Sequence, residues 1–383
     1  MPTPHTTEAQ IFGIKPGTLL SPLTLKKLEE ASRLLGEINQ VASNVFEFDF
    51  IIEALKNIES LTSARIEGTT GNLEDLYLQE SLSMERKKQL KLYSAINYKF
   101  TINELESIVS KYKRFDIQLI RHLHKTLTEK DPSTKGIPGK FRGIDVRIQN
   151  SKLGDFYPPN HVKVPELMDK LVVEAVKDEY PNLIQTALVH YWFESIHPFE
   201  DGNGRTGRLL ITTILLQRGV LKSPILNLSQ FFEIHRDEYI AALRNVTDKS
   251  DYNIWVDFFL GGVVAQCNRN LDLIQNLRTM RDKNSQKIRE SIKGSQVAQH
   301  ILEFALNNLY VTAPQARSYL EKLGLPLKDA YQAAINNIHK LEELGILEKM
   351  PGTERGIRFV HAELKRLIIG NRDARTATTI IEG

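Results

Sequence analysis

Cysteine is almost absent from this sequence, charge of one sign is not in excess, and long apolar runs are missing. Cys267 is the only cysteine among 383 residues, which excludes an intrachain disulfide and a metal cluster held by several thiolates. Because it lies in the apolar stretch VVAQC, we expect a buried structural thiol rather than a reactive one. The 50 basic and 47 acidic residues nearly cancel, so the net charge of +3 does not indicate a dedicated nucleic-acid or membrane binder.

The first residues, MPTPHTTEAQIFG, lack the charged and apolar regions of a secretory signal, and no run of 18 apolar residues could span a bilayer. These absences predict a cytoplasmic protein with no membrane contact. The composition that remains is that of an ordinary globular protein, with 41% hydrophobic and 25% charged residues. A chain of this length is expected to form two or three domains.

Hydrophobic periodicity predicts a mainly α-helical protein. After an extended arm over the first 20 residues, apolar side chains recur at three- and four-residue steps through most of the chain. The predicted helices cover about 23–41, 46–67, 72–82, 85–112, 115–130, 163–178, 182–195, 205–218, 235–245 and 251–291.

One segment in the middle of the chain departs from the helical pattern. Residues 131–143 are dense in proline and glycine, which predicts a loop. Residues 144–149 alternate apolar and polar side chains, residues 150–155 are typical of a turn, and Phe156-Tyr157 can pair back before two prolines. We therefore expect a β-hairpin over about 144–157.

The carboxy-terminal part changes character after Gly294. Helical patterns over 296–307, 312–323 and 328–344 precede two short apolar segments, 345–349 and 357–360, which flank a Pro-Gly turn. Three helices followed by two strands predict a small winged-helix domain. The expected domains are an amino-terminal helical region over 1–112, a central domain over 113–291 and the winged helix over 292–383.

The segment His197 to Arg208, HPFEDGNGRTGR, carries the chemistry. Gly202 and Gly204 permit a tight turn whose backbone amides can approach a ligand closely. The helix that follows points its free amides and positive dipole end into this turn, which favours phosphate.

Charged side chains surround this anion site. Arg205 and Arg208 are three residues apart, hence on one helix face, and both can reach one polyphosphate. Asp201 is a hard oxygen ligand suited to Mg²⁺ on ATP phosphates, and His197 can accept a proton near neutral pH. Each part alone is common in structural roles, but together in twelve residues they indicate phosphoryl-type transfer.

The segment resembles the motif of the Fic family, HxFx(D/E)GNGRxxR, at every specified position. The resemblance extends from about residue 20 to 290. It implies a Fic-type helical bundle that transfers AMP from ATP to a Ser, Thr or Tyr hydroxyl of a target protein, or of itself. It implies His197 as the base, Phe199 as the anchor of the loop, Asp201 as the Mg²⁺ ligand, and nucleotide contacts by Gly202, Asn203, Gly204, Arg205, Thr206, Gly207 and Arg208.

The same resemblance assigns further residues around the nucleotide. The hairpin is similar to the family's flap, which aligns the target by strand pairing and brings Ile148 and Gln149 near the nucleotide. Tyr239 would form part of the adenine pocket, although Ile240 replaces a tyrosine of many relatives. Gly204 favours AMP transfer, because relatives that transfer phosphate carry lysine there.

An upstream segment, Ser63 to Gly68, resembles the family's inhibitory motif, (S/T)xxxE(G/N). Glu67 lies near the predicted end of a helix, where the helix dipole disfavours an acid. By resemblance, Glu67 pairs with Arg208 and withholds it from the γ-phosphate. A switch that frees Glu67 is then implied, with a change in self-association, such as a homodimer, as one candidate.

Two alternatives stay open, AMP removal and DNA binding, and a third, an inactive scaffold, does not fit the sequence. The glutamate could position water for removal of AMP, so the protein could be a de-AMPylase or act in both directions. An inactive scaffold conflicts with the complete motif. A DNA-binding regulator would use residues 328–344, but the basic side chains there are offset by acidic ones; these are Lys328, His339 and Lys340 against Asp329, Glu342 and Glu343.

Overall fold

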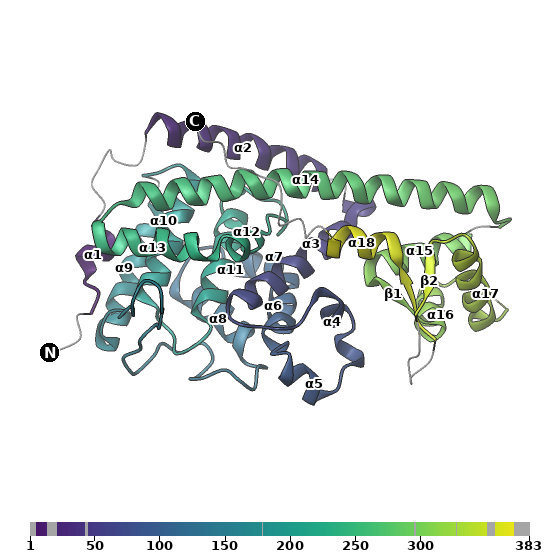
Figure 1. Cartoon of the computed structure of the whole chain (residues 1–383), viewed down its shortest axis with the longest axis horizontal. Coiled ribbons are helices and arrows are strands. Elements are labelled where there is room, and N and C mark those ends of the chain that lie inside the picture. Colours follow the sequence, from purple (N-terminus) through teal and green to yellow (C-terminus); the bar gives the residue numbers. More distant parts are fainter. Residues whose placement is uncertain are drawn as a thin grey trace. The chain divides into compact units, whose positions relative to one another are not determined.

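The structure is a computed structural model that describes residues 5–13, 21–42, 45–177, 179–294, 296–326, 328–350 and 357–370. Within these residues the protein is mainly α-helical and has one three-stranded sheet (Figure 1). The predicted fold class is therefore confirmed. The chain divides into two compact units, and the predicted three-domain division stays a prediction. Unit 1 comprises residues 1–45, 55–72 and 82–269, and unit 2 comprises residues 46–54, 73–81 and 270–383.

Unit 1 is built around two central helices, α10 (Asn182–Ile196) and α11 (Asn203–Gln217). Every residue of α10 from Leu183 to Phe193 is buried, and so is every residue of α11 from Arg205 to Leu215. Helices that are buried on all sides form the centre of a bundle. The loop between them holds the first half of the HPFEDGNGRTGR segment, and the second half begins α11, so the core positions this loop from both ends.

Other helices of unit 1 pack around this pair. Helix α9 (Val164–Val176) packs on α10, α8 (Ile117–Thr128) packs on α11, and α6 (Tyr93–Asn103) packs on α8. Unit 1 also holds α1 (Glu8–Phe12), α2 (Pro22–Ala42), most of α3 (Val45–Ile66), α5 (Met84–Gln89), α7 (Leu105–Lys111), η2 (His161–Lys163), α12 (Leu228–Ile234), α13 (Arg236–Lys249) and the first half of α14 (Tyr252–Ser291).

The carboxy-terminal part of unit 2 has the three predicted helices and the two predicted strands, and a strand that was not predicted, β1, lies between the first two helices. Helix α15 (Gln296–Asn308), strand β1 (Tyr310–Val311), helices α16 (Ala313–Lys322) and α17 (Ala330–Glu343), and strands β2 (Leu347–Lys349) and β3 (Phe359–His361) follow one another. The sheet is antiparallel with the order β1-β3-β2, and Val311 pairs with Phe359 while Glu348 pairs with Val360. The winged-helix assignment stays a prediction, and the predicted Pro-Gly turn lies outside the described residues.

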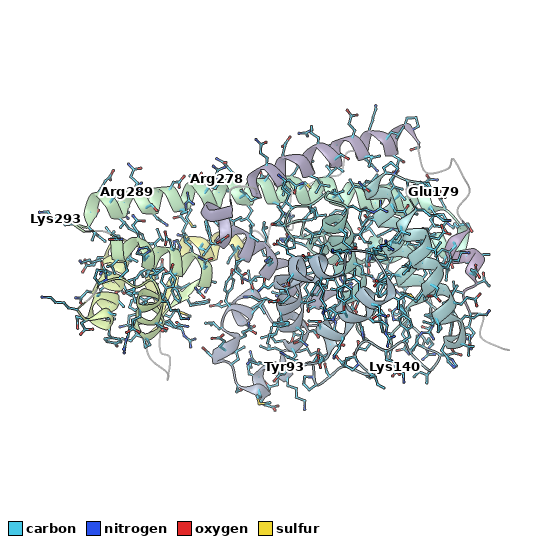
Figure 2. The ribbon with its side chains drawn as sticks, turned by 180° about the vertical axis from the view of Figure 1, so that it is seen from behind. Tyr93, Lys140, Glu179, Arg278, Arg289 and Lys293 are labelled. Atoms are coloured by element: carbon cyan, nitrogen blue, oxygen red, sulfur yellow. The ribbon has the colours of Figure 1, made fainter. Side chains whose placement is uncertain are left out.

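Segments from other parts of the chain complete unit 2. They are the start of α3, α4 (Leu73–Tyr77), the 3₁₀ turn η1 (Gln79–Ser81), the second half of α14 and α18 (Ala362–Gly370). Arg358 donates a hydrogen bond to Ser81 and Lys365 donates one to Glu74, so the carboxy-terminal elements hold this distant segment. Figure 2 shows Arg278 and Arg289 along α14 and Lys293 beyond its end.

Several predicted elements were wrong in detail. The predicted extended arm contains α1, which begins at a capping box formed by Thr7 and Gln10. The predicted helix over 85–112 is three helices, because Lys91 adopts a left-handed conformation with φ of 49° and α6 ends before Glu104. Helices α12 and α18 were not predicted.

The predicted β-hairpin is also wrong as regular structure. Ile148 and Phe156 exchange two backbone hydrogen bonds of 2.9 Å, and this single antiparallel pair is all the pairing that 144–157 shows. Side chains take over the backbone amides beyond it. Asn150 accepts bonds from the amides of Lys152 and Leu153, and its own amide donates to Asp155, so the ladder cannot extend.

Candidate functional site

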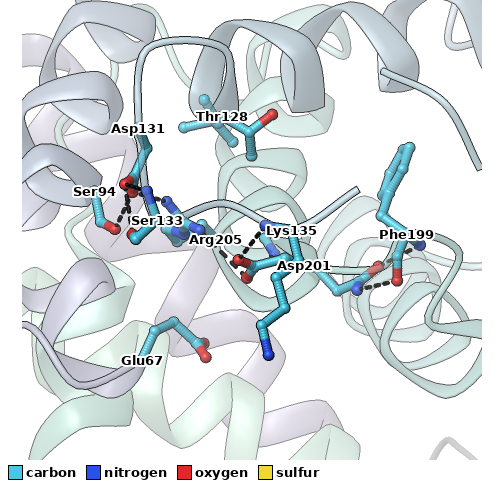
Figure 3. A network of polar contacts seen from close by, with 12 residues as sticks. Glu67, Ser94, Thr128, Asp131, Ser133, Lys135, Phe199, Asp201 and Arg205 are labelled. Atoms are coloured by element: carbon cyan, nitrogen blue, oxygen red, sulfur yellow. Dashed lines mark hydrogen bonds and ion pairs between the residues drawn. The ribbon is translucent and has the colours of Figure 1, made fainter. Parts of the chain in front are cut away.

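The loop between α10 and α11 has a defined backbone. His197 closes α10 in a left-handed conformation, with φ of 51°, and its amide donates to the Phe193 carbonyl at 2.9 Å. Gly202, with φ of 76°, begins the turn into α11. Asn203 ties the turn together, because its amide group donates to the Phe199 carbonyl and accepts from the Phe199 amide (Figure 3). The Asn203 side chain is thus engaged within the loop.

Two residues that the sequence analysis missed also hold this loop. His124 of α8 stacks on Phe199 with ring centroids 3.6 Å apart. Its Nδ1 accepts from the Gly139 amide at 2.8 Å, so its Nε2 carries the proton and donates to the Asp201 carbonyl at 2.9 Å. Burial lowers the pKa of His124 to about 4, which keeps this tautomer neutral.

Arg142 is the second such residue, and it braces the loop from the flap side. Its Nε donates to the His197 carbonyl at 2.8 Å, its backbone amide to the Pro198 carbonyl at 2.9 Å, and its Nη2 to the Pro159 carbonyl at 2.5 Å. A buried arginine that donates to several carbonyl groups holds the backbone in place. The sequence around it, GKFR at residues 139–142, does not indicate which carbonyl groups it reaches.

Arg205 lies between two carboxylates beside the turn (Figure 3). Its guanidinium is 3.5 Å from Asp131 and 3.6 Å from Asp201, and its side chain is buried. Asp131 also accepts hydrogen bonds from Ser94 and Ser133. The Asp201 carboxylate accepts bonds from the amides of Lys135 and Gly202, and its side chain is 37% exposed, so one face of it remains open.

Arg208 is hydrogen-bonded to the end of α3. Its Nε donates to Ser63 Oγ at 3.0 Å, and its Nη2 donates to the Ser63 carbonyl and to Glu67 Oε1, both at 2.9 Å. Partial removal of water acts to raise the pKa of Glu67, whose side chain is still 42% exposed, but the charge and hydrogen bond of Arg208 outweigh this effect and the pKa is lowered. Gly204 makes room for this pair, because a Cβ there would lie 2.2 Å from Glu67 Oε1.

A cavity of about 430 Å³ lies beside this ion pair. Seven of the predicted site residues line it; they are Glu67, Ile148, Gln149, His197, Gly204, Arg208 and Tyr239. The other predicted residues lie around it without lining it; they are Ser63, Asp201, Gly202, Asn203, Arg205, Thr206 and Gly207. Ile240 also lines the cavity. So do Leu243 and Thr247, which the sequence analysis did not name, although their spacing places them on the same face of α13.

The Tyr239 hydroxyl is hydrogen-bonded within the protein. His190 Nδ1 lies 3.0 Å from the Gly207 carbonyl, which can only accept, so His190 Nε2 is the acceptor for the Tyr239 hydroxyl at 2.8 Å. Burial lowers the pKa of His190 to about 3, so this arrangement persists at neutral pH. The Tyr239 ring stacks on the Phe232 ring with centroids 4.4 Å apart, and it forms an aromatic part of the cavity wall.

Two titratable groups on α10 face the cavity. Burial and the charge of Arg142 lower the pKa of His197 to about 4, so the ring is neutral at physiological pH. Burial raises the pKa of Glu194 to about 8, against the nearby charge of Arg208. The cavity therefore offers a neutral imidazole and a carboxyl that holds its proton at pH 7, beside a paired arginine.

Within the described residues, no group of three or more His, Cys, Asp or Glu side chains could hold a metal by itself, and no helix is long and apolar enough to cross a membrane. Cys267 is buried, as predicted, and burial raises the pKa of its thiol to about 12.

Comparison with known proteins gives two family matches. Residues 114–215 match the Fic/DOC family and residues 25–104 match the Fic/DOC family N-terminal region. A probable protein adenylyltransferase of Aquifex aeolicus is 29% identical over 165 residues, which are 41% of this chain and 48% of that protein. Protein adenylyltransferase Fic of Aedes aegypti is 40% identical over 88 residues, 23% of this chain and 15% of that protein. The matches thus span half or less of the length of these relatives.

Solved structures share the fold. A Fic family protein from Desulfovibrio desulfuricans G20 superposes with a TM-score of 0.57 at 19% identity, over 91% of this chain and 98% of that one. Fic-1 from C. elegans superposes with a TM-score of 0.52 at 19% identity, over 66% of this chain and 73% of that one. Residues 25–104 and 114–215 thus carry the amino-terminal region and the catalytic-loop region of the Fic/DOC family, in a chain whose fold is similar to that of Fic family structures.

Proposed function

We propose that this protein is a protein adenylyltransferase, which transfers AMP from ATP to a hydroxyl group of a target protein. The observation that carries the proposal is that His197, Gly204 and Arg208 line one cavity with the flap residues Ile148 and Gln149. The relatives named protein adenylyltransferase support the same activity. The family resemblance assigns the target to the flap, where an extended segment could pair with the backbone.

The chemistry follows from the atoms around this cavity. The hydroxyl oxygen of the target attacks the α-phosphorus of ATP while its proton passes to the ring of His197. The bond from the α-phosphorus to the bridging oxygen breaks, and pyrophosphate leaves. His197 can act as a base because burial keeps its ring neutral at pH 7. The backbone amides at the start of α11 would stabilise the charge that develops on the phosphate oxygens.

Magnesium fits this site through Asp201. Mg²⁺ is commonly held by one or two carboxylates together with substrate phosphates and water, so a single partly exposed carboxylate beside the phosphate site is sufficient. The ion would neutralise phosphate charge and favour departure of pyrophosphate. Arg205 would keep the Asp201 carboxylate in place, since it is 3.6 Å away and fixed by Asp131.

We also propose that Glu67 restrains the reaction. In the proposed role Arg208 binds the γ-phosphate, yet Ser63 and Glu67 occupy its Nε and both donors of its Nη2. A γ-phosphate would have to displace Glu67 to bind Nη2. ATP bound without that contact would present its α-phosphorus out of line for attack.

The test is transfer of label from ATP that carries a radioactive α-phosphate. Wild type, Glu67→Gly and His197→Ala are compared with Mg²⁺ and cell lysate as the source of targets. We expect labelled protein to increase about tenfold or more in Glu67→Gly, since one charge-assisted contact no longer competes with phosphate. Label in the double variant with His197→Ala should be absent.

Absence of label from every variant would refute AMP transfer. Removal of AMP would then become the leading function, because Glu67 lines the same cavity as His197 and could orient a water there. Release of AMP from a labelled protein, dependent on Glu67, would establish it. DNA binding gains no support from α17, where His339 pairs with Glu342 at 3.0 Å.

A further inference from the structure

Helix α3 carries a second glutamate, Glu59, that the proposed reaction does not use. Residues four positions apart lie on one face of a helix. Glu59 and Ser63 have this spacing within α3, and Glu67 continues it directly after the helix ends. Ser63 and Glu67 contact Arg208. Glu59 lies two turns earlier, and its side chain is 3% exposed.

The Glu59 carboxylate binds two other helices. Tyr98 of α6 donates its hydroxyl to Oε1 at 3.1 Å, Ser229 of α12 donates its amide to Oε2 at 3.1 Å, and the Ser229 hydroxyl also donates to Oε1. Among the described residues, no basic side chain forms an ion pair with Glu59. A buried carboxylate of this kind is costly to move, because any displacement leaves its charge or its three donors unsatisfied.

A second contact joins α3 to α12. Arg65 of α3 lies 3.7 Å from Glu233 of α12, and its Nε donates to the Gly71 carbonyl. Helix α12 leads directly into α13, where Tyr239 and Ile240 line the cavity. These contacts set the position of α3 against α12, which leads into a helix that lines the cavity.

We propose that Glu59 is a positioning residue: its hydrogen bonds to Ser229 and Tyr98 hold α3 in the register at which Glu67 reaches Arg208. The proposal rests on the restraint proposed above and identifies what maintains it. Glu59 does not line the cavity and forms no hydrogen bond with Arg208, whose charge alone acts on it, so the contact by which it would affect transfer is the placement of Glu67. Weakening this anchor releases the restraint without removing the glutamate that exerts it.

The test is Glu59→Gln, which keeps the side chain's size but turns an amide donor toward the donors of Ser229 or Tyr98. We expect AMP transfer to rise about tenfold, a shift typical of one lost hydrogen bond to a charged group. In the Glu67→Gly background the same change should add nothing, because the restraint is already gone. Ser229→Ala removes the hydroxyl donor of α12 but keeps the backbone amide donor, so it should raise AMP transfer by less than Glu59→Gln does.

Thr62→Val is the matched control on the same helix. Thr62 is buried, but its hydroxyl donates only to carbonyls of α3 itself, so its loss should leave transfer unchanged. Glu59→Gln could instead lower AMP transfer by the same factor in wild type and in Glu67→Gly. That result would overturn the proposal, because it is what loss of a purely structural residue would give.

Hydrogen exchange separates this proposal from the proposed function. Glu59→Gln should speed exchange of the backbone amides of residues 63–68, and Thr62→Val should not. If Glu67→Gly produces no label, the AMP-transfer proposal fails while faster exchange in Glu59→Gln still supports the anchor. Unchanged exchange over 63–68 would refute the anchor whatever the enzyme assay shows.

Discussion

Among single residues, the site depends most on a histidine that burial keeps uncharged. His197 closes α10 with a left-handed backbone, and the Arg142 side chain holds its carbonyl. The same burial, aided by the positive charge of Arg142, lowers the pKa of the ring to about 4. A protonated ring cannot accept the proton of an attacking hydroxyl, so the lowered pKa moves the loss of activity to lower pH.

This predicts the pH dependence of transfer. In the Glu67→Gly variant, kcat/KM should stay level from pH 8 down to about pH 6, whereas a base of ordinary pKa, near 6.5, would already be mostly protonated at the lower limit. Initial rates of label transfer at subsaturating ATP measure this profile. A midpoint between pH 6 and 7 would show that another group, or a solvated His197, limits the reaction.

Among the helices, α8 positions the catalytic loop through one side chain. His124 stacks on Phe199, accepts from Gly139 and donates to Asp201, so it joins α8, the segment leading to the flap and the loop. These three contacts need a neutral ring of defined tautomer. A single imidazole thus couples the position of the loop to that of the segment before the flap.

Replacement of His124 should therefore impair the reaction more than ATP binding. In the Glu67→Gly background, His124→Ala should lower kcat about 10- to 100-fold, because a small displacement of the loop misaligns the reacting atoms. KM for ATP should change less. His122→Ala, whose ring instead packs against Tyr112, serves as the control and should keep kcat. Equal kcat in both variants would contradict a positioning role for His124.

The sequence predicted the elements that carry strong local signals. The helical periods of α10 and α11, and the Thr312 cap and Pro314 of α16, are local features, and the structure has these helices close to the predicted bounds. The contacts of His124, Arg142 and Glu59 join segments far apart in the chain. No local pattern contains them, which is why these residues could not be assigned from the sequence.

The prediction of a β-hairpin at the flap, residues 144–157, was wrong for a different reason. Alternation of apolar and polar residues over 144–149 is a valid strand signal, but Asn150 and Asp155 offer the backbone local side-chain partners that compete with a ladder. Pairing therefore stops after Ile148 and Phe156. Ile148 and Gln149 line the cavity although the predicted strands around them are absent, and their position near a nucleotide stays a prediction.

Across the entire chain, neither compact unit is a continuous stretch of sequence. Unit 2 takes residues 46–54 and 73–81 from the amino-terminal part in addition to residues 270–383. Inside this unit, Glu74 pairs with Lys365 at 2.9 Å and Ser81 accepts from Arg358. A cut at the predicted domain boundary before residue 292 would therefore remove partners of segments that remain.

A chain that ends at Ser291 should consequently be less stable. We expect a lower melting temperature and binding of a dye that reports exposed apolar surface, because buried Leu73 and Leu76 belong to a segment that loses its surroundings. The full-length protein, melted under the same conditions, is the control. A chain ending at Ser291 with unchanged melting would support the three predicted domains as independent folding units.

Gly204 contributes both to the proposed inhibition by Glu67 and to the proposed phosphate site, which limits how the sequence can change at this position. Its missing side chain leaves the space in which Glu67 meets Arg208, and the same bare backbone lies at the proposed phosphate site. A change to alanine would push the Glu67 carboxylate from its place and at the same time crowd the nucleotide. Substitution of Gly204 would therefore remove the proposed inhibition and impair AMP transfer at the same time. Substitution of Glu67 would remove the inhibition and leave the nucleotide site intact.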